Sequence, residues 1–356
     1  MVTSTKQHQK KFINWETLPF VIIYAPLIFV WSYYAIKAKA FWFMSNVNPT
    51  LEFSGLEGET KQEMYLQLPI ESYPETLYVK AGEDILQVIN RLKNSSIKYP
   101  FIVKPEVGMQ GLLFRKIIDE AMLFKYHSPI PFDYLIQQLV NLPIEISVFH
   151  IRYPRQLKGK ITGLIMKEYL AVIGDGVNTL LSLIMKHPKA KFRLVEMKAK
   201  HHAHLNNTIA KGEKYILSMA GNHNRGATFV NLHSQIDDKL CSVFDNISIF
   251  TKSFYYGRYD VKCASIEELK KGKYFSILEF NGTGAEPNHI YDCGMSYSNA
   301  LGEIIKHWKD MYLIGRINKK EGHHYWGFFK GFIFLRNAKK FFSRMREYDI
   351  NIDVEK

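Results

Sequence analysis

The sequence is poor in cysteine. It contains three cysteines in 356 residues, Cys241, Cys263 and Cys293, and no two of them form a Cys-x-x-Cys pair. An odd number without that spacing indicates neither a disulfide framework nor a cysteine zinc site. We therefore expect a protein of a reducing compartment.

Two familiar motifs are also missing. No Gly-x-x-x-x-Gly-Lys-Ser/Thr stretch occurs, which excludes a Walker-type phosphate loop, and without a Gly-x-Ser-x-Gly stretch a Ser-His-Asp hydrolase has no support. No segment is strongly low in complexity, and 47% of the residues are hydrophobic. The chain is therefore a folded one, long enough for one large or two moderate domains with a sizeable core.

Acidic residues are in deficit. The 34 aspartates and glutamates face 47 lysines and arginines, a formal charge of +13. This surplus implies an anionic partner, and charge alone leaves nucleic acid, nucleotide phosphates and an anionic membrane surface open.

Charged residues are absent from Leu18 to Ile36, a run of apolar and aromatic residues. The run is long enough to cross a hydrocarbon core of roughly 30 Å. Its bulky aromatics and the lack of a small-residue cleavage site disfavour a signal peptide. Pro19 and Pro26 predict a kink, so a re-entrant or shallow helix competes with a spanning one. The remaining alternative is a buried helix of a soluble domain; we favour a membrane anchor.

Aromatic and basic residues alternate near the other end of the chain, from Tyr325 to Arg346. This pattern is typical of a helix that lies on anionic lipid. A nucleic-acid-binding stripe would carry similar charge but rarely so many phenylalanines, so we favour lipid and expect no nucleic-acid partner.

Two short polar patterns indicate a metal-phosphate site. If residues 257–260 and 277–283 are strands, side chains two apart share a face. Arg258 then lies beside Asp260, and Glu279 beside Asn281. Carboxylate and amide oxygens suit Mg²⁺, which keeps substrate phosphates as further ligands, and an arginine can grip a phosphate as a fork. The alternative is that these are solvent-facing positions of amphipathic strands.

The middle of the chain predicts a mixture of helices and strands. Residues 75–79 and 99–105 are expected to be strands, and residues 84–92 a short helix. Lys104 interrupts the apolar second strand. The glycines of the following turn, Gly108 and Gly111, permit backbone N–H groups to approach phosphates, although similar turns occur in many ordinary hairpins.

The order of these features resembles the ATP-grasp superfamily, in particular D-alanine:D-alanine ligase and the ATP-grasp part of cyanophycin synthetase, over about residues 75–295. The resemblance implies an α+β fold in which two subdomains grip ATP, here with an N-terminal hydrophobic membrane helix. It implies ATP and Mg²⁺ (or Mn²⁺) as cofactors.

The resemblance also implies roles for individual residues. The metal ligands are Asp260, Glu279 and Asn281, and the groups expected to act on the transferring phosphoryl or acyl phosphate are Arg258, Lys167 and Arg225. The residues expected to bind ATP are Lys104 on the α- and β-phosphates, the hairpin Gly108, Met109, Gln110 and Gly111 over the triphosphate, the adenine hinge Gln137, Gln138, Leu139 and Val140, and Glu145 on the ribose.

Four segments are expected. Residues 1–45 form a membrane anchor, residues 46–74 a short linker, residues 75–310 the ATP-grasp domain, and residues 311–356 a basic aromatic interfacial segment. The linker is too short for the domain that precedes the ATP-grasp core in the family. The residues that would recognise D-alanine therefore have no counterpart.

The expected function is a membrane-associated ligase that joins a carboxylate to an amine through an acyl phosphate, with its catalytic domain facing the cytosol. The sequence names neither substrate. One alternative is an ATP-grasp kinase that stops at phosphorylation. The other is a non-catalytic, membrane-tethered protein that binds anions.

Overall fold

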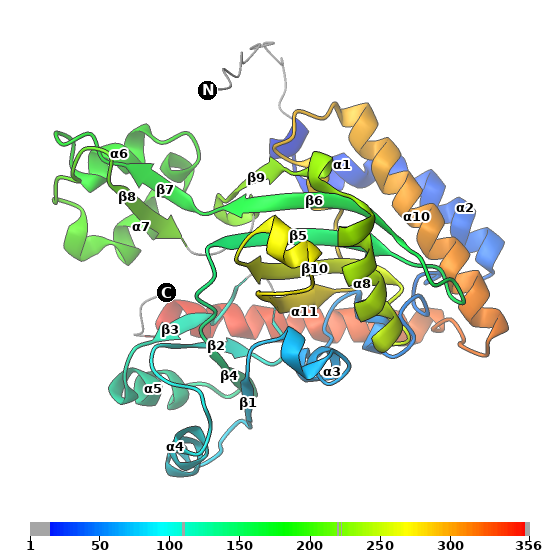
Figure 1. Cartoon of the computed structure of the whole chain (residues 1–356), viewed down its shortest axis with the longest axis horizontal. Helices are drawn as coiled ribbons and strands as arrows, with labels where there is room; N and C mark the ends of the chain where they lie inside the picture. Colours follow the sequence, from blue (N-terminus) through cyan, green and yellow to red (C-terminus); the bar gives the residue numbers. More distant parts are fainter. Residues whose placement is uncertain (1–14, 109–110, 219–220, 222, 353–356) are drawn as a thin grey trace.

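A computed structural model describes residues 15–108, 111–218, 221 and 223–352. Within these ranges the chain forms three antiparallel sheets flanked by helices (Figure 1), so the predicted α+β class is confirmed. The first sheet has the order β1-β4-β2-β3, the second β11-β10-β5-β6-β9, and the third pairs β7 with β8. The strands are β1 (Thr76–Val79), β2 (Phe101–Pro105), β3 (Arg115–Ile117), β4 (Tyr134–Gln138), β5 (Ile144–Ile151), β6 (Lys160–Glu168), β7 (Leu170–Ile173), β8 (Lys214–Ser218), β9 (Thr228–Asn231), β10 (Tyr256–Cys263) and β11 (Phe275–Asn281).

The first sheet packs against two short helices, α4 (Ile85–Lys93) and α5 (Glu120–His127). Each helix begins at an aspartate whose carboxylate accepts a backbone N–H of the first turn, Asp84 for α4 and Asp119 for α5. Such caps satisfy N–H groups that have no partner inside the helix. Both expected strands and the expected helix of this region are confirmed.

The second sheet has two different faces. On one face, Tyr259 and Val261 join a core with α8 (Asp238–Phe250) and α9 (Ile266–Lys270). Because strand side chains alternate, Arg258 and Asp260 lie on the opposite face. The third sheet, with α6 (Leu180–Lys186) and α7 (Leu194–Lys200), has its own small core and forms the lobe at the upper left of Figure 1.

The N-terminal apolar run is helical but broken at the predicted place. Helix α1 (Phe20–Tyr24) and helix α2 (Ile28–Ala38) are joined by a 3-10 turn that contains Pro26. One side packs along α10 (Tyr297–Lys320), where Leu27 and Tyr34 are buried. The other side is open. Residues Phe20–Ala38 have the length and composition of a membrane span, and most of them are not buried.

The expected linker is part of the core, which corrects its description as a connection. Val47 and Phe53 are 0% exposed, and the side-chain amide of Asn48 bonds to the backbone of Tyr255 and Tyr256. The segment contains helix α3 (Lys61–Tyr65), which contacts β11. The sequence did not reveal this because scattered apolar residues between glycines show no strand or helix period.

The expected interfacial segment, residues 311–356, is also only partly exposed. Helix α11 (Phe328–Asn351) begins with exposed phenylalanines, but Phe342 and Met345 are buried in the core of the first sheet. Its second half therefore belongs to the fold. The expected boundary at residue 310 falls inside α10. Interleaved aromatic and basic residues describe a lipid-facing helix and a half-buried surface helix equally well, which explains the difference.

Candidate active site

Strands β10 and β11 pair so that the predicted metal ligands meet. Asp260 lies opposite Glu279, and Arg258 lies opposite Asn281. The alternation expected from the sequence holds on both strands. A carboxylate pair flanked by an amide and a guanidinium therefore forms on the face of the second sheet that α8 leaves open.

Asp260 is surrounded by cations. Its Oδ1 lies 3.1 Å from Lys167 Nζ and 3.2 Å from Arg258 Nε, and it also accepts the hydroxyl of Ser147. Burial alone would raise the pKa of this carboxyl, but Arg258 and Lys167 outweigh burial and lower the pKa to about 2. Asp260 is therefore ionised at every physiological pH.

Lys167 links Asp260 to the predicted ribose ligand. Its Nζ lies 3.2 Å from Glu145 Oε1, and Tyr169 donates its hydroxyl to the same carboxylate. Burial alone would lower the pKa of Lys167, but the Asp260 and Glu145 carboxylates outweigh burial and the pKa is raised. A lysine charged and fixed in this way can neutralise phosphate oxygens without moving far.

Glu279 has a different cation. Its Oε1 lies 3.5 Å from Lys61 Nζ, and its side chain is 37% exposed. Beside it, Asn281 Nδ2 is buried and has no hydrogen-bond partner in the described chain. Because rotation about the Cβ–Cγ bond exchanges the amide nitrogen and oxygen, an oxygen can occupy that position. Two carboxylates and an amide oxygen fit the ligand preference of Mg²⁺ or Mn²⁺.

Lys104 projects from β2 toward β11, the strand that carries Glu279 and Asn281. Its Nζ donates to Tyr65 Oη at 3.0 Å and to the Leu278 carbonyl at 3.2 Å. Burial lowers the pKa of Lys104 to about 8, against its ordinary 10.5. A lysine whose charge is this poorly stabilised gains strongly from a phosphate, which would supply the missing negative charge.

The glycine turn lies next to this group. A Cβ atom at residue 108 would stand 3.1 Å from Lys61 Nζ, so glycine leaves room for that lysine. Gly111 has a φ of +71°, which favours glycine. Met109 and Gln110 lie outside the described residues. A small hollow beneath the turn is lined by Glu59, Thr60, Lys61, Met64, Gly108, Glu279, Phe280 and Asn281.

The predicted adenine hinge divides into two parts. Gln137 is 3% exposed, stands between β1 and β2, and donates its Nε2 to Thr76 Oγ1 at 2.8 Å. Gln138 pairs with Phe101 of β2, and its backbone N–H bonds to the carbonyl of Glu75, just before β1. Leu139 and Val140 follow the strand and connect the two sheets. Backbone contacts to a base would therefore fall on Leu139 and Val140.

Arg225 stands apart from this network. Its Nη1 lies 3.4 Å from Glu196 Oε1 on α7, in the small lobe. None of the ion pairs in the described chain joins it to the carboxylates of β10 and β11. Its role on an acyl phosphate stays a prediction.

Two residues of the site were missed by sequence analysis. Lys61 and Tyr65 both come from α3, in the segment expected to be a linker, and contact Glu279 and Lys104 respectively. A capping threonine, Thr60, followed by Glu63 marks the start of this helix and could have revealed it. Its position against β11 depends on tertiary packing and had no local signal.

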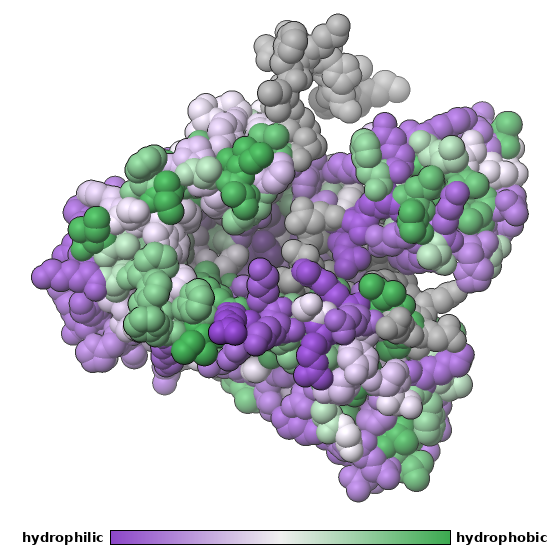
Figure 2. Space-filling view, turned by 180° about the vertical axis from the view of Figure 1, so that it is seen from behind, coloured by the Kyte–Doolittle hydropathy of each residue, from purple (hydrophilic) through white to green (hydrophobic). Residues whose placement is uncertain are grey.

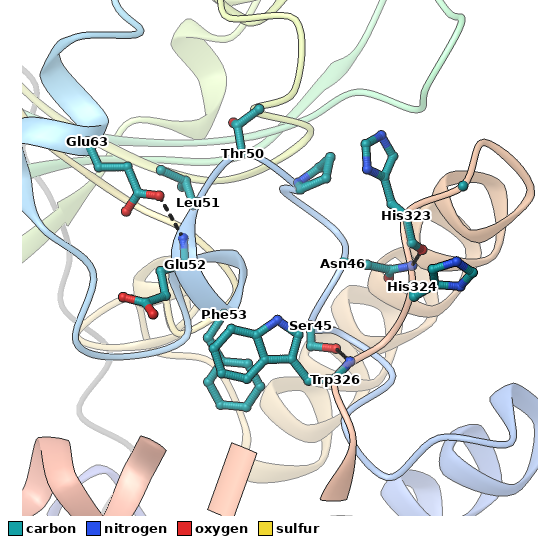
Figure 3. Close-up of a pocket in the computed structure, with 12 residues that line it drawn as sticks. Ser45, Asn46, Thr50, Leu51, Glu52, Phe53, Glu63, His323, His324 and Trp326 are labelled. Atoms are coloured by element: carbon teal, nitrogen blue, oxygen red, sulfur yellow. Dashed lines mark hydrogen bonds between the residues drawn. The ribbon is translucent and has the colours of Figure 1, made fainter. Parts of the chain in front are cut away.

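A larger cavity, of ≈ 380 Å³, lies outside this network (Figure 3). It opens between residues 45–53 and the turn before α11, with His323 on one side and Glu52 on the other. It shares no lining residue with the hollow beside Glu279 and contains none of the predicted site residues.

Comparison with known proteins gave structural likeness without sequence likeness. A scan of protein-family models and a search of curated proteins returned no match. Among solved structures, the chain is similar to VanG D-Ala:D-Ser ligase from Enterococcus faecalis (TM-score 0.42, 11% identity, 72% of this chain and 64% of that one). It is also similar to D-alanine–D-alanine ligase from Bacillus anthracis (0.41, 14%, 74% and 68%) and to the ATP-grasp ligase PsnB (0.36, 11%, 69% and 59%). The match thus spans under two thirds of the first of these chains.

Proposed function

We propose that this protein is a Mg²⁺- and ATP-dependent ligase that joins a carboxylate to an amine. The observation that carries the proposal is the pairing of Asp260 with Glu279 and of Arg258 with Asn281 across β10 and β11. Lys167 contacts Asp260 on this face, and Lys104 contacts the Leu278 carbonyl at its edge. Both ammonium groups could therefore bind phosphates there. The order of motifs along the chain, which resembles that of ATP-grasp ligases, supports the same assignment.

The chemistry needs no protein nucleophile. A substrate carboxylate oxygen takes the γ-phosphoryl group of ATP, and ADP leaves. The amine nitrogen then attacks the acyl carbon, loses a proton and expels inorganic phosphate. When bound, Mg²⁺ would neutralise phosphate oxygens. Asp260, Glu279 and Asn281 would hold it.

The cationic side chains have separate tasks in this proposal. Lys167 is held by Asp260 and Glu145 and supplies a fixed positive charge to the transferring group. Arg258 offers two N–H groups to one phosphate. Burial lowers the pKa of Lys104 to about 8, and a phosphate would stabilise its charged form.

A trapping experiment tests the reaction class. The full chain is given ATP, Mg²⁺, hydroxylamine and a mixture of candidate carboxylates, and acyl hydroxamates are detected by mass spectrometry. An activated acyl group should yield a hydroxamate that requires ATP and is absent with Glu279→Gln. A phosphorylated hydroxyl product without hydroxamate would identify a kinase instead, and the absence of ATP binding would leave a non-catalytic anion-binding protein.

The protein is also proposed to lie on a membrane. Apolar side chains gather on the left half of Figure 2, the side of α1 and α2. Val21, Phe29 and Ile36 are 76%, 79% and 77% exposed there. Phe41 joins this surface to the start of α11, because its ring lies 5.2 Å from that of Phe328. An exposed apolar surface of this kind marks a docking site.

The packing of α1 and α2 favours docking in the plane of the membrane over crossing it. Their inner side, with Ile23, Leu27 and Tyr34, is buried against the body of the protein. A crossing helix would have to give up these contacts. Since ATP is cytosolic, the docked face would meet the cytosolic leaflet.

A further inference from the structure

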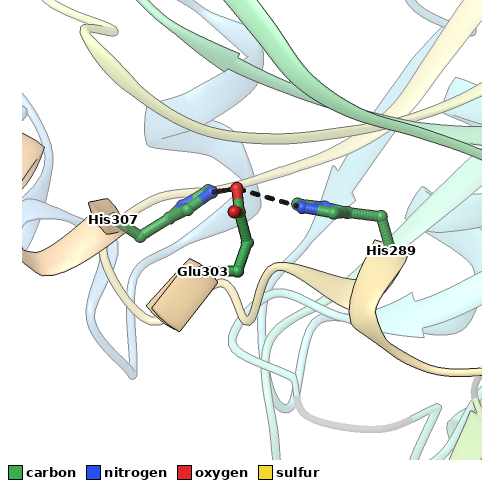
Figure 4. A group of neighbouring side chains, drawn as sticks. All are labelled: His289, Glu303 and His307. Carbon is green, nitrogen blue, oxygen red and sulfur yellow. Dashed lines mark ion pairs between the residues drawn. The ribbon is translucent and has the colours of Figure 1, made fainter. Parts of the chain in front are cut away.

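A second group of polar side chains lies on the same face of the second sheet, over β5 and β6. It consists of Glu303 and His307, one helical turn apart on α10, and His289 from the 3-10 turn Asn288–Ile290. Both imidazole rings point toward the Glu303 carboxylate, which lies between them (Figure 4). None of the three belongs to the proposed ATP site.

Three of the four ring nitrogens of these histidines are buried without a hydrogen-bond partner in the described chain. His289 is 8% exposed and His307 is 1% exposed, and neither Nε2 has a hydrogen-bond partner. His289 Nε2 lies 3.5 Å from Glu303 Oε1, and His307 Nε2 lies 3.6 Å from the same oxygen. These separations are too long for good hydrogen bonds. Buried polar atoms without partners are costly and call for an explanation.

The separations are those of ligands around one metal ion. Zinc binds histidine nitrogen and carboxylate oxygen at about 2.0–2.2 Å, so two ligands of a tetrahedral ion stand about 3.3–3.6 Å apart. The ligand atoms of all three side chains lie within 4.8 Å of one another. Two histidines and one carboxylate form a ligand set that suits a divalent transition ion better than Mg²⁺.

The surrounding residues hold the rings in ligating positions. Tyr256 Oη lies 3.0 Å from His307 Nδ1, which can therefore keep its proton and leave Nε2 for a metal. The ring of His289 fits against β6 because residue 163 is glycine: a Cβ there would stand 2.0 Å from His289 Nδ1. A mid-strand glycine marks close approach by another group.

A comparable group elsewhere lacks this character. Glu16, His223 and Asp292 also approach one another, but Lys189 Nζ already lies 3.1 Å from Asp292 Oδ2. A lysine there supplies the positive charge. Glu303 also has a lysine neighbour, but Lys306 Nζ lies 3.1 Å from the other carboxylate oxygen, Oε2, and leaves Oε1 to the two histidines.

We propose that His289, Glu303 and His307 bind a divalent transition-metal ion of the zinc type, separate from the magnesium site. Three protein ligands leave a fourth position for water or a small ligand. The ion would fasten α10 to the 3-10 turn Asn288–Ile290, which packs on β6, close to where α1 and α2 pack. The proposal goes beyond the ligase function and does not depend on it.

Metal content is the first test. The full chain, purified without chelator and with an untagged C-terminus, should carry about one zinc per chain by mass spectrometry, and Glu303→Gln should lose it. His233→Gln, which changes an exposed histidine, is the matched control and should keep the metal. Zinc at background level in the wild type, even after dialysis against micromolar Zn²⁺, would overturn the proposal.

Cobalt substitution locates the ion. Co²⁺ bound by two histidines and a carboxylate should give the strong visible absorption of a four-coordinate ion. His307→Gln should abolish this band, and Asp260→Asn should leave it unchanged. A band that vanishes only in Asp260→Asn would place the ion in the magnesium site and contradict the assignment.

A milder variant guards against loss of folding. Tyr256→Phe removes only the hydroxyl that fixes the His307 ring and should weaken Co²⁺ binding by about 10-fold, as loss of an outer partner typically does. Circular dichroism confirms that each variant is folded. Unchanged Co²⁺ affinity in both Tyr256→Phe and folded Glu303→Gln would reduce the group to a buried polar contact.

Discussion

Asp260 and Glu279 face each other across two strands but have different surroundings. Asp260 is 6% exposed and neutralises Lys167 and Arg258, whereas the Glu279 side chain is 37% exposed. Removing one member of a buried charge group leaves the others uncompensated. The same change to a carboxylate that water reaches costs little. The two proposed metal ligands should therefore be separable in stability.

The first prediction concerns these two positions. Both Asp260→Asn and Glu279→Gln should abolish Mg²⁺-ATP turnover, because each weakens the charge that would hold the cation. Only Asp260→Asn should lower the free energy of unfolding, measured by urea denaturation. Near-normal ATP consumption by either variant at limiting Mg²⁺ would contradict the proposed site. Equal unfolding energies would contradict the charge network.

The second prediction concerns the pH dependence of stability and follows from the lowered pKa of Asp260. Its pKa is about 2 in the folded protein and 3.8 ordinarily, so ionised Asp260 stabilises the fold above pH 3.8. That stabilisation, on the order of 2 kcal/mol, is lost as pH falls from 3.8 toward 2. The difference in unfolding energy between wild type and Asp260→Asn should therefore shrink below about pH 4. A constant difference from pH 7 to pH 3 would show that another effect dominates.

Lys104 gives the third prediction, in which binding and stability move in opposite directions. Its folded pKa of about 8 lies below its ordinary 10.5, so the charged form destabilises the fold at pH 7. This cost fades as pH rises from 8 to 10.5. Lys104→Met should thus raise the urea midpoint at pH 7 but not at pH 10.5.

The same variant should weaken ATP binding by about 10-fold or more, since a charge-assisted phosphate contact is worth roughly 1.5–3 kcal/mol. Calorimetry at pH 7 measures this affinity. Lys80→Met, at an exposed lysine paired with Asp133, is the control and should bind ATP normally. A Lys104→Met protein with unchanged affinity would make Lys104 a structural lysine.

Local patterns were sufficient to predict that Asp260 and Glu279 face the same side of the sheet, but not to predict all the cations beside them. Asp260 and Glu279 could be identified from the sequence because strand alternation repeats on two neighbouring segments. Lys61 does not, since it reaches Glu279 only after α3 packs on β11. No regularity near residue 61 encodes that long-range contact.

At the scale of elements, a buried ion pair contributes to the attachment of α11. Asp349 Oδ1 lies 2.9 Å from Arg115 Nη1 and accepts the backbone N–H of Leu113 at the same distance. Arg115 is 1% exposed and Asp349 is 7% exposed. Together with Phe342 and Met345, this pair attaches the end of the chain to the first sheet.

The fourth prediction tests that attachment. Asp349→Ala should cost about 3–5 kcal/mol of unfolding free energy, because Arg115 loses a buried countercharge. Lys271→Ala breaks the exposed Lys271–Glu268 pair and should leave the urea midpoint unchanged. If the two variants unfold at the same urea concentration, α11 does not depend on this pair.

Elements with a clear period were predicted, and those without one were not. The strands around Lys104, Asp260 and Glu279 follow alternation, and the kink at Pro26 follows from the missing N–H of proline. The buried course of residues 43–55 was not foreseen, because it depends on single contacts such as those of Asn48. The second half of α11 was mistaken for a membrane surface for the same reason.

At the scale of the whole molecule, the two large sheets are joined by segments that are distant in sequence. Helix α11 runs along the second sheet toward β3 of the first (Figure 1), and α3 adds Lys61 and Tyr65 between β2 and β11. The site is therefore completed by the N-terminal part of the chain. Sequence order alone could not supply this arrangement.

The apolar surface of α1 and α2 can be tested without disturbing the core. Deleting the two helices would remove the buried Leu27 and Tyr34 and expose the residues that they cover, so point changes on the open side are better. The triple variant Val21→Ser, Phe29→Ser and Ile36→Ser is matched by a control that removes three equally exposed apolar residues elsewhere, Leu86→Ser, Phe192→Ser and Val195→Ser.

The fifth prediction is that the triple variant binds vesicles with anionic lipid at least about tenfold more weakly than wild type, since burial of one large apolar side chain is worth roughly 1.5–3 kcal/mol. The control should bind like wild type. Salt separates the second contribution: basic side chains of α11 such as Arg336 and Lys339 act through charge, which is screened beyond about 8–10 Å at physiological ionic strength. Raising the salt should release the triple variant completely and wild type only in part. Equal vesicle binding by the triple variant and its control would show that this face does not meet lipid.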